Sequence, residues 1–383
     1  MAKYKLGDIC TIISGSTPNT GIEEYWKGNL KWITPAEIEE DTYIISDSER
    51  KITELAVKKT GLSSFPKGTV ILSSRAPIGK VAIAGCEMYC NQGFKNLICS
   101  EKINNKYLYW FLKRNTKYLN SLGRGATFKE ISKTIVSEIE INLPEYRKQE
   151  KIANELEKIN KIIGCRKQEL KLFEDLVKAR FVEMFGTLNN PSQEFTKATL
   201  KELCNKITDG KHGGCKVEEG TERYFVGARE IYDDEVHYDT APEINVDEFE
   251  KDYKRCNIEI GDFLIVNTGA TIGKSAITTD ERTEHTLLQK SVALLKVKKE
   301  LLNPVFLKWC YRVNTQMYIV ESASAQPNLL LSKINSTVIY VPDMDLQNQF
   351  ADFVTQVNKS KLPQELCTIL QENSLYKLVK VLV

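Results

Sequence analysis

The 383-residue chain lacks the features that mark membrane and secreted proteins. It contains no run of about 18 apolar residues that could span a bilayer. Met1–Gly15 has no apolar core of the signal-peptide type. Its ten cysteines follow no disulfide-framework spacing, which is typical of reduced and mostly buried thiols. We therefore expect a protein that stays in the cytoplasm and contacts no membrane.

An excess of charge of one sign is also absent. The chain has 53 Lys and Arg against 51 Asp and Glu, for a net charge of +2. Any surface for nucleic acid must therefore be local. Residues 101–134 are one candidate, because they hold eight Lys or Arg against two Glu, Glu101 and Glu130. On charge alone, a solvated helix face explains this segment equally well.

Signatures of catalysis and of cofactor binding are missing as well. Gly269–Ser275 follows an apolar run and resembles a phosphate-binding loop, but it has three residues between its glycines where that motif needs four. The cysteines and histidines do not form the paired Cys-x-x-Cys spacing of a zinc site. The chain also lacks an Asn-Pro-Pro-aromatic methyltransferase motif, a glycine-rich cofactor fingerprint and a nuclease carboxylate-lysine cluster. We predict no cofactor, no metal and no catalytic residue.

What the chain does contain is a long internal repeat. Ile78–Ile83 reads Ile-Gly-Lys-Val-Ala-Ile, and 194 positions later Ile272–Ile277 reads Ile-Gly-Lys-Ser-Ala-Ile. Other segments match in the same order: Leu6–Thr11 with Leu200–Asn205, Lys31–Ile38 with Tyr224–Ile231, and Gly68–Leu72 with Gly261–Ile265. Because each copy is long enough to bury its own core, the repeat predicts two related domains.

Each copy predicts a hairpin followed by a helix. The strand, turn and strand are Thr69–Ser73, Ser74–Gly79 and Lys80–Ala84 in the first copy, and Asp262–Asn267, Thr268–Gly273 and Lys274–Thr278 in the second. Asn104 can cap a helix over Lys106–Ser121, and Asn303-Pro304 can open its counterpart. The fold class expected for each domain is α+β, largely antiparallel.

A long helical pattern follows each domain. Leu143-Pro144 with Gln149 opens the first, and Val341-Pro342 with Gln347 opens the second. In the first, ten positions from 152 to 184 alternate steps of four and three residues, and eight of them are apolar. Such a stripe needs a partner helix, and Leu346, Phe350, Phe353 and Val357 begin the same register. Pro363 predicts a kink or break near 361–363.

Antiparallel pairing of the two helices as a coiled coil would relate the repeats by a pseudo-twofold axis. The residues predicted to pair are Ile152, Leu156, Ile159, Ile163, Leu170, Phe173, Val177 and Met184 on the first helix, and Phe350, Phe353 and Val357 on the second. The predicted boundaries are 1–143 and 187–341 for the domains, and 144–186 and 342–383 for the helices.

This arrangement resembles the DNA-specificity subunit of Type I restriction-modification systems, and the resemblance covers essentially the whole chain. It is carried by the tandem repeat, the proline-to-glutamine helix openings, the Ile-Gly-Lys turns and Asn91–Gly93, which reads Asn-Gln-Gly. The resemblance implies two target-recognition domains, each reading half of a bipartite, asymmetric sequence in double-stranded DNA. It also implies a helical spacer that docks two methyltransferase subunits, which motor-endonuclease subunits join. Adenine methylation and ATP-dependent cleavage would then lie in those partners.

Two features depart from the family pattern. The second copy has Leu288–Ser291 in place of Asn-Gln-Gly, and Pro363 interrupts the second helix. These departures put the geometry of the spacer and the docking on that side in question.

Side chains suited to reading DNA gather in the turns. Arg pairs with guanine, Asn and Gln pair with adenine, and Lys and Ser contact the backbone, although glycine-rich turns are usually only turns. The candidates in the first domain are Ser73, Ser74, Arg75, Lys80, Gln92, Lys95, Arg124, Thr127 and Lys129. Those in the second are Lys211, His212, Arg229, Asn267, Thr268, Thr271, Lys274, Gln289, Lys290, Gln326 and Asn328.

Two other classes of function are compatible with the same features. A coiled-coil structural adaptor with two globular caps would explain the heptads without DNA, but the local basic excess and the repeated lysine-bearing turns argue against it. A stand-alone enzyme using the Gly273–Ser275 turn on phosphates is disfavoured by the glycine spacing.

Overall fold

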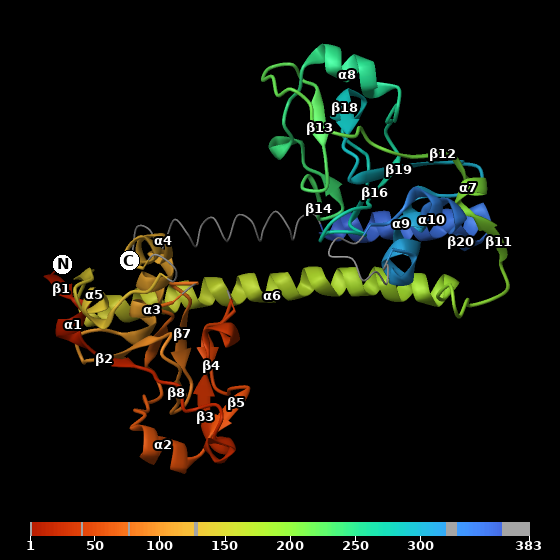
Figure 1. The fold of residues 1–383 in the computed structure, drawn as a ribbon. Helices are drawn as coiled ribbons and strands as arrows, with labels where there is room; N and C mark the ends of the chain where they lie inside the picture. The colour runs from red at the N-terminus through yellow and green to blue at the C-terminus, as the bar shows by residue number, and fades with distance from the viewer. Residues whose placement is uncertain (1, 40, 76, 126–128, 319–327, 362–383) are drawn as a thin grey trace. The chain divides into compact units, whose positions relative to one another are not determined.

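The structure, a computed structural model, describes residues 2–39, 41–75, 77–125, 129–318 and 328–361 (Figure 1). The described chain divides into two compact units, one running up to Gln168 and one beginning at Glu169. The helix α6 (Tyr146–Phe185) is continuous through this boundary. Within the described residues, no helix combines the length and the apolar character needed to cross a bilayer.

The first unit contains an α+β domain followed by the start of α6. Its elements are β1 (Ala2–Lys5), α1 (Leu6–Ile9), β2 (Cys10–Ser14), η1 (Glu23–Tyr25), β3 (Trp26–Ile33), η2 (Pro35–Glu37), β4 (Ile44–Ile45), β5 (Arg50–Ile52), α2 (Glu54–Thr60), β6 (Val70–Leu72), β7 (Val81–Ala84), β8 (Tyr89–Cys90), β9 (Lys95–Cys99), α3 (Asn105–Arg114), α4 (Thr116–Ser121), α5 (Lys133–Ser137) and β10 (Glu140–Leu143).

The main sheet of this unit has the strand order β2-β9-β6-β7-β4. All its pairs are antiparallel except β4 with β7, and the smaller sheet β5-β3-β8 contains a second parallel pair, β3 with β8. The predicted hairpin is therefore present as β6 and β7. The first and last strands, β1 and β10, pair antiparallel from Ala2–Leu143 to Lys5–Glu140, which closes the domain on itself.

Helix α3 covers one face of the main sheet and supplies much of the core. Its buried Tyr107, Leu108 and Leu112 belong to one apolar cluster with strand residues such as Val70 and Leu97. As predicted, Asn104 caps this helix, and its side-chain oxygen accepts from the N–H groups of Lys106 and Tyr107 at 3.0 and 3.2 Å.

The single helix predicted over Lys106–Ser121 is wrong, because the structure has two helices, α3 and α4. The break falls at Asn115, whose backbone leaves helical geometry at φ −91° and ψ 17°. The Asn115 side chain donates to the carbonyl of Phe111 at 2.8 Å. Asparagine competes with helical hydrogen bonding in this way, and the helical periodicity did not reveal it.

The second unit repeats the same architecture. Its elements are β11 (Thr196–Thr199), α7 (Leu200–Leu203), β12 (Cys204–Asp209), β13 (Tyr224–Val226), β14 (Ile231–Tyr232), β15 (Glu235–Val236), η3 (Tyr238–Thr240), α8 (Val246–Tyr253), β16 (Phe263–Val266), β17 (Ser275–Ile277), η4 (Glu281–His285), β18 (Thr286–Leu288), β19 (Val292–Val297), α9 (Pro304–Val313), η5 (Thr315–Met317), α10 (Leu331–Ser336) and β20 (Val338–Val341), with a further helix over 344–361.

The two units correspond strand by strand. The sheet β12-β19-β16-β17 matches β2-β9-β6-β7. The parallel pair β13–β18 matches β3–β8, and the closing pair β11–β20 matches β1–β10. The duplication read from the sequence is therefore a duplication of fold.

The end of α6 pairs with the helix 344–361 inside the second unit. Phe181 and Phe185 contact Phe350, with ring centroids 5.3 and 5.6 Å apart, and Arg180 lies over the ring of Phe353 at 5.9 Å. Residue 180 of α6 thus meets residue 353 of the partner, and residue 185 meets residue 350, so the two helices run antiparallel. The break predicted near 361–363 reaches beyond residue 361, the last described residue, and the remainder of the second helix lies outside the described residues.

Several of the predicted pairing residues pack in the cores of the two units. Ile152 and Leu156 lie in the core of the first domain, because the start of α6 packs against α3 and the sheet. In the second unit the apolar cluster contains Val177, Phe350 and Val357, with Phe173, Met184 and Phe353 partly buried against it. Ile163 is buried, and Ile159 and Leu170 are half-buried.

Phe181 and Phe185, which the alternating steps missed, are fully buried where α6 meets the helix 344–361.

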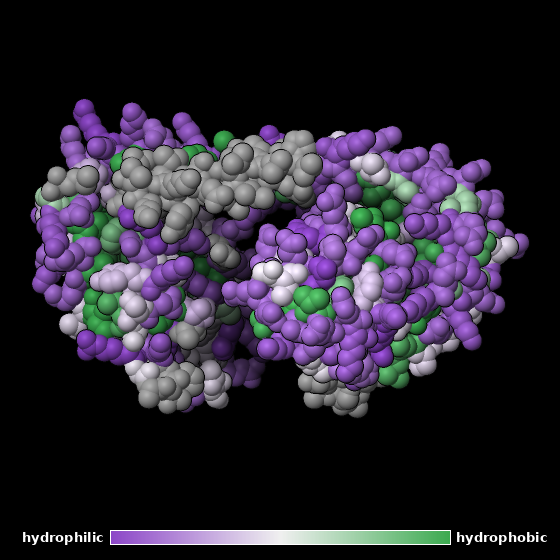
Figure 2. All heavy atoms as spheres, turned by 90° about the horizontal axis from the view of Figure 1, so that it is seen from above, coloured by the Kyte–Doolittle hydropathy of each residue, from purple (hydrophilic) through white to green (hydrophobic). Residues whose placement is uncertain are grey.

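On the face seen in Figure 2, hydrophilic residues cover most of the described surface, and hydrophobic residues form small separate patches. Within the described residues, much of the apolar stripe of each long helix is used in the two cores.

Candidate nucleic-acid interface

The turn between β6 and β7 is built by the Ser73 side chain and backbone. The N–H of Ser73 donates to the carbonyl of Lys80 at 2.9 Å, and the N–H of Gly79 donates to the carbonyl of Ser73 at 3.1 Å. The Ser73 hydroxyl donates to the carbonyl of Pro77 at 2.7 Å and accepts from the N–H of Lys80 at 2.9 Å. Gly79 has φ +93°, a conformation that glycine adopts without strain.

The second domain forms the same turn between β16 and β17. There the N–H of Val266 donates to the carbonyl of Lys274 at 2.8 Å, and the N–H of Gly273 donates to Val266 at 2.9 Å. Gly273 has φ +90°. Both Ile-Gly-Lys motifs therefore end a tight turn whose glycine must adopt a left-handed backbone.

These bonds set the register between the two turns. Val266 takes the place of Ser73 and Gly273 that of Gly79, so the second turn is one residue longer. Arg75 bridges to Glu130 as Thr268 bridges to Asn328. Arg75 therefore stands where Thr268 stands, and the extra residue of the second turn lies between Thr268 and Gly273.

Both turns are anchored to two neighbouring segments by backbone bonds. The N–H of Ser74 donates to Gly93 at 2.7 Å, and its carbonyl accepts from Ile131 at 2.9 Å. Asn267 makes the equivalent bonds to Ser291 and Leu329, at 3.0 and 2.7 Å. Because the anchor is a backbone carbonyl, the second domain keeps this contact without the Asn-Gln-Gly sequence.

An ion-pair cluster lies on the first turn. The Nε of Arg75 is 2.9 Å from Oε2 of Glu130, and the Nζ of Lys95 is 3.2 Å from Oε1 of the same carboxylate. Lys95 is 6% exposed and also bonds the Ser74 hydroxyl at 3.3 Å, whereas the side chain of Arg75 is 44% exposed. Partial burial would raise the pKa of Glu130, but hydrogen bonds and charges from Arg75 and Lys95 outweigh it and lower that pKa.

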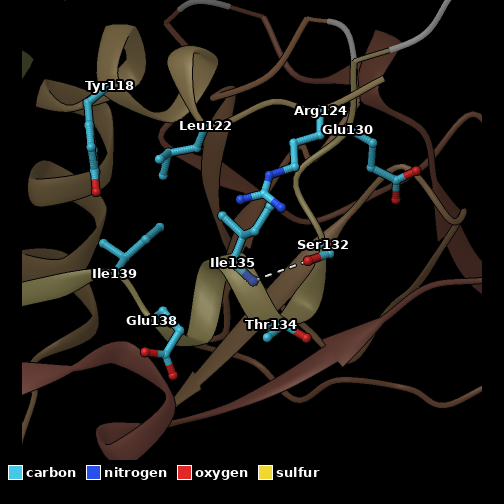
Figure 3. A pocket seen from close by; sticks show the side chains of 9 residues that line it. All are labelled: Tyr118, Leu122, Arg124, Glu130, Ser132, Thr134, Ile135, Glu138 and Ile139. Atoms are coloured by element: carbon cyan, nitrogen blue, oxygen red, sulfur yellow. Dashed lines mark hydrogen bonds between the residues drawn. The ribbon is translucent and has the colours of Figure 1, made fainter. Parts of the chain in front are cut away.

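Beside this cluster lies an open hollow of about 600 Å³. Figure 3 shows the guanidinium of Arg124 pointing into it, while the carboxylate of Glu130 points away. The hollow is lined by Tyr118, Leu122, Arg124, Glu130, Ser132, Thr134, Ile135, Glu138 and Ile139. The basic segment of the sequence thus presents an arginine in a partly apolar depression.

In the second domain, backbone hydrogen bonds of Lys211 join its loop to the segment 288–290. Its N–H donates to Leu288 at 2.7 Å, and its carbonyl accepts from Lys290 at 2.9 Å. The Lys211 ammonium pairs with Asp252, and this hydrogen bond raises the pKa of Lys211. His212 is exposed, 3.5 Å from the carboxylate of Asp209.

The candidates fall into groups by exposure. Buried are Ser73, Ser74, Lys95 and Asn267; half-buried are Lys80, Lys211, Thr268, Thr271 and Gln289; exposed are Arg75, Gln92, Arg124, Lys129, His212, Arg229, Lys274, Lys290 and Asn328. Thr127 and Gln326 lie outside the described residues. The buried members shape the turns, and the exposed members are available to a ligand.

Two further candidates, Lys80 and Gln92, are also engaged by the protein itself. The ammonium of Lys80 donates to the carbonyl of Pro35 at 3.0 Å, and the Gln92 side chain accepts from the Thr17 hydroxyl. Sequence reasoning missed Glu130 as a member of the site. Its signal was its position as one of two acids in the basic segment 101–134.

The chain matches one protein family over most of its length. Residues 1–172 and 192–368 match the family described as the Type I restriction modification DNA specificity domain. The specificity subunit of the Type I restriction enzyme MjaIX from Methanocaldococcus jannaschii is 42% identical over 184 residues, 47% of this chain and 43% of that subunit. The EcoprrI specificity subunit from Escherichia coli is 29% identical over 111 residues, 28% of this chain and 27% of that subunit. The matched segments span less than half the length of these relatives.

Two solved structures have a similar fold. The S subunit of a Type I restriction-modification system from M. genitalium is 15% identical with a TM-score of 0.56, covering 100% of this chain and 95% of that one. A chain from a study of complex assembly and conformational transition in the type I R-M system is 16% identical with a TM-score of 0.57, covering 100% and 97%. At these identities the likeness concerns the fold alone.

Proposed function

Because the chain belongs to the Type I restriction-modification DNA specificity family, we propose that it reads the DNA sequence for a modification and cleavage complex. Each globular domain, 1–143 and 187–341, reads one half of a bipartite, asymmetric site in double-stranded DNA. The helices over 144–186 and 342–383 form the spacer between the halves.

One observation carries this proposal. Equivalent turns with the same backbone bonds occur in both domains, yet Arg75 stands in one where Thr268 stands in the other, and Lys80 is held by Pro35 whereas Lys274 is exposed. A shared frame with different exposed groups suits two readers of different sequence, because base edges differ in their donors and acceptors. A purely structural adaptor has no use for this difference.

The contacts divide by chemistry. Exposed Arg75, Arg124 and Asn328 suit base edges, and exposed lysines such as Lys129, Lys274 and Lys290 suit phosphates. Ser73, Ser74, Lys95 and Asn267 support the turns from beneath. With a net charge of +2, the affinity comes from these local groups.

The chain works as a non-catalytic subunit in the cytoplasm. Two methyltransferase subunits dock on the helical spacer and modify adenine, and motor-endonuclease subunits join them for ATP-dependent cleavage. The chain's own contribution is to choose the site.

A domain exchange tests this proposal. The full chain is expressed with its host's methyltransferase subunit, and methylated motifs are mapped genome-wide, with a strain lacking the chain as control. Replacing 187–341 by the equivalent domain of another family member changes one half of the motif and leaves the other half intact. A change in both halves contradicts modular reading, and methylation independent of the chain contradicts the whole proposal.

A further inference from the structure

Glu130 lies between two arginines on the first reading turn. Backbone bridges pair it with Arg75 on one side and Arg124 on the other. Of these two arginines, Arg75 forms an ion pair with the carboxylate, through Nε. The two terminal nitrogens of Arg75 have no partner among the described residues, and the side chain is 44% exposed.

A buried lysine holds Glu130 from beneath. Lys95 is 6% exposed, and its ammonium contacts Oε1 of Glu130 at 3.2 Å and the Ser74 hydroxyl at 3.3 Å. A buried ammonium strongly favours an ionised partner within reach. One carboxylate oxygen therefore meets Lys95 and the other meets Arg75, which leaves Glu130 little freedom to turn.

The second domain provides an internal comparison. Thr268 and Asn328 take the places of Arg75 and Glu130, with 3.4 Å between the Thr268 hydroxyl and the Asn328 side-chain oxygen. Strand pairing puts Ala293 in the place of Lys95, because Val292 follows Ser291 as Phe94 follows Gly93. The shared fold therefore does not require the charged cluster, which belongs to one domain.

We infer that Glu130, seated on Lys95, is a positioning residue that fixes Arg75 to read a guanine in the half-site of the first domain, an assignment that rests on the proposed function. A guanidinium held through Nε presents its two terminal nitrogens as a planar fork. The N7 and O6 atoms of guanine are the paired acceptors that such a fork matches in the major groove. The neutral Thr268 and Asn328 read a different base pair in the other half-site.

A DNA phosphate also offers paired acceptor oxygens, so the test must distinguish a contact of Arg75 with guanine from a contact with phosphate. The full chain is assembled with its methyltransferase subunits, and its motif is mapped for the wild type. Competition binding then compares duplexes that differ at single base pairs of the first half-site, at several salt concentrations. The variants are Glu130→Gln, Arg75→Lys and Arg75→Ala, and Asn328→Ala is the matched control in the second domain.

The wild-type motif is expected to hold a guanine in the first half-site. Glu130→Gln and Arg75→Lys lower discrimination at that base pair by about one to two orders of magnitude, with little change in salt dependence. Asn328→Ala leaves the first half-site unchanged. Arg75→Lys keeps the charge on an exposed side chain, so the test does not depend on Glu130→Gln folding normally.

Unchanged discrimination in Arg75→Lys overturns the inference. So does a uniform loss of affinity across all sequences with a salt slope smaller by about 1 in Arg75→Ala, which is the behaviour of a phosphate contact. If the wild-type complex selects no sequence at all, the proposed function itself fails. That result differs from a complex that still selects its sequence and whose discrimination does not change in Glu130→Gln.

Discussion

The side-chain oxygen of Gln149 accepts a hydrogen bond from the backbone N–H of Asn104 at 2.9 Å, and Gln347 makes the same bond with Asn303 at 2.9 Å. The amide nitrogen of Gln149 donates to the carbonyls of Lys102 and Pro144, both at 3.0 Å. That of Gln347 donates to the carbonyls of Leu301 and Pro342, at 3.1 and 2.7 Å. Each glutamine is thus a buried clamp between a domain helix and the start of a long helix.

Replacing these clamps destabilises the unit that contains them. Gln149→Met and Gln347→Met keep the side-chain volume but leave buried backbone groups without partners, so each lowers the free energy of unfolding by about 3 kcal/mol. Denaturant unfolding of the full chain measures this. The control Gln168→Met, exposed on α6, stays within about 0.5 kcal/mol. Equal stability of Gln149→Met and the control contradicts the clamp.

The turn glycines tolerate no side chain. Gly79→Ala and Gly273→Ala force alanine into φ +93° and +90°, which costs about 1–2 kcal/mol, and a Cβ at Gly79 would lie 2.8 Å from Thr116 Cγ2. Both variants also weaken DNA binding by displacing the turn. Gly164→Ala is the matched control, since nothing lies within 4 Å of its Cβ and alanine favours the helix by about 1 kcal/mol. Thermal unfolding and DNA binding report the two effects.

Phe350 is the centre of the helix contact in the second unit. Phe350→Ala removes a fully buried ring that meets Phe181, Phe185 and Trp309, and it lowers the free energy of unfolding by about 3–5 kcal/mol. Leu172→Ala, on an α6 residue that is 59% exposed, changes it by about 0.5 kcal/mol or less. Similar effects of the two substitutions would show that this contact is not part of the core.

Asp234 compensates Lys308, a lysine of the second domain whose side chain is only 15% exposed. Its carboxylate is 2.9 Å from Lys308, whose pKa is lowered by burial although Asp234 opposes this. Asp234→Asn keeps the backbone at φ +66°, which asparagine also adopts, but leaves the ammonium uncompensated and destabilises the unit by about 3 kcal/mol. Asp234 also pairs with Arg312, so adding Lys308→Met to Asp234→Asn restores only the part of this loss that comes from Lys308. Denaturant unfolding of both variants measures these changes in stability. If the double variant shows no recovery, the pairing of Asp234 with Lys308 is contradicted.

The ion pairs of Glu130 make the first unit sensitive to acid. Because the folded pKa of Glu130 is lowered, its contribution to stability is complete above the unfolded pKa of about 4.3 and is lost as pH falls through the folded value. Denaturant unfolding at several pH values below about 5 measures this component. Glu130→Gln removes it, whereas Glu101→Gln, at an exposed position, retains it. An unchanged pH profile in Glu130→Gln contradicts the pairing.

The sequence by itself determined the duplication, the α+β class of both domains, the hairpin turns and the long first helix. Each of these is written in local patterns: strand-turn-strand runs, caps such as Asn104 and Asn303, and an apolar stripe of helical spacing. These elements can be predicted from local patterns because a residue's neighbours in the chain fix its backbone preferences.

Only the tertiary structure decided which side chains face inward and which meet. Ser74 and Lys95, which the sequence offers as DNA contacts, are buried, while Glu130 reaches Arg75 across 55 positions of sequence. The start of α6 packs on its own domain through Leu156, and its end pairs with a helix through Phe181. Such contacts depend on how sheets and helices pack against one another in three dimensions, and the spacing of residues along the chain does not determine that packing.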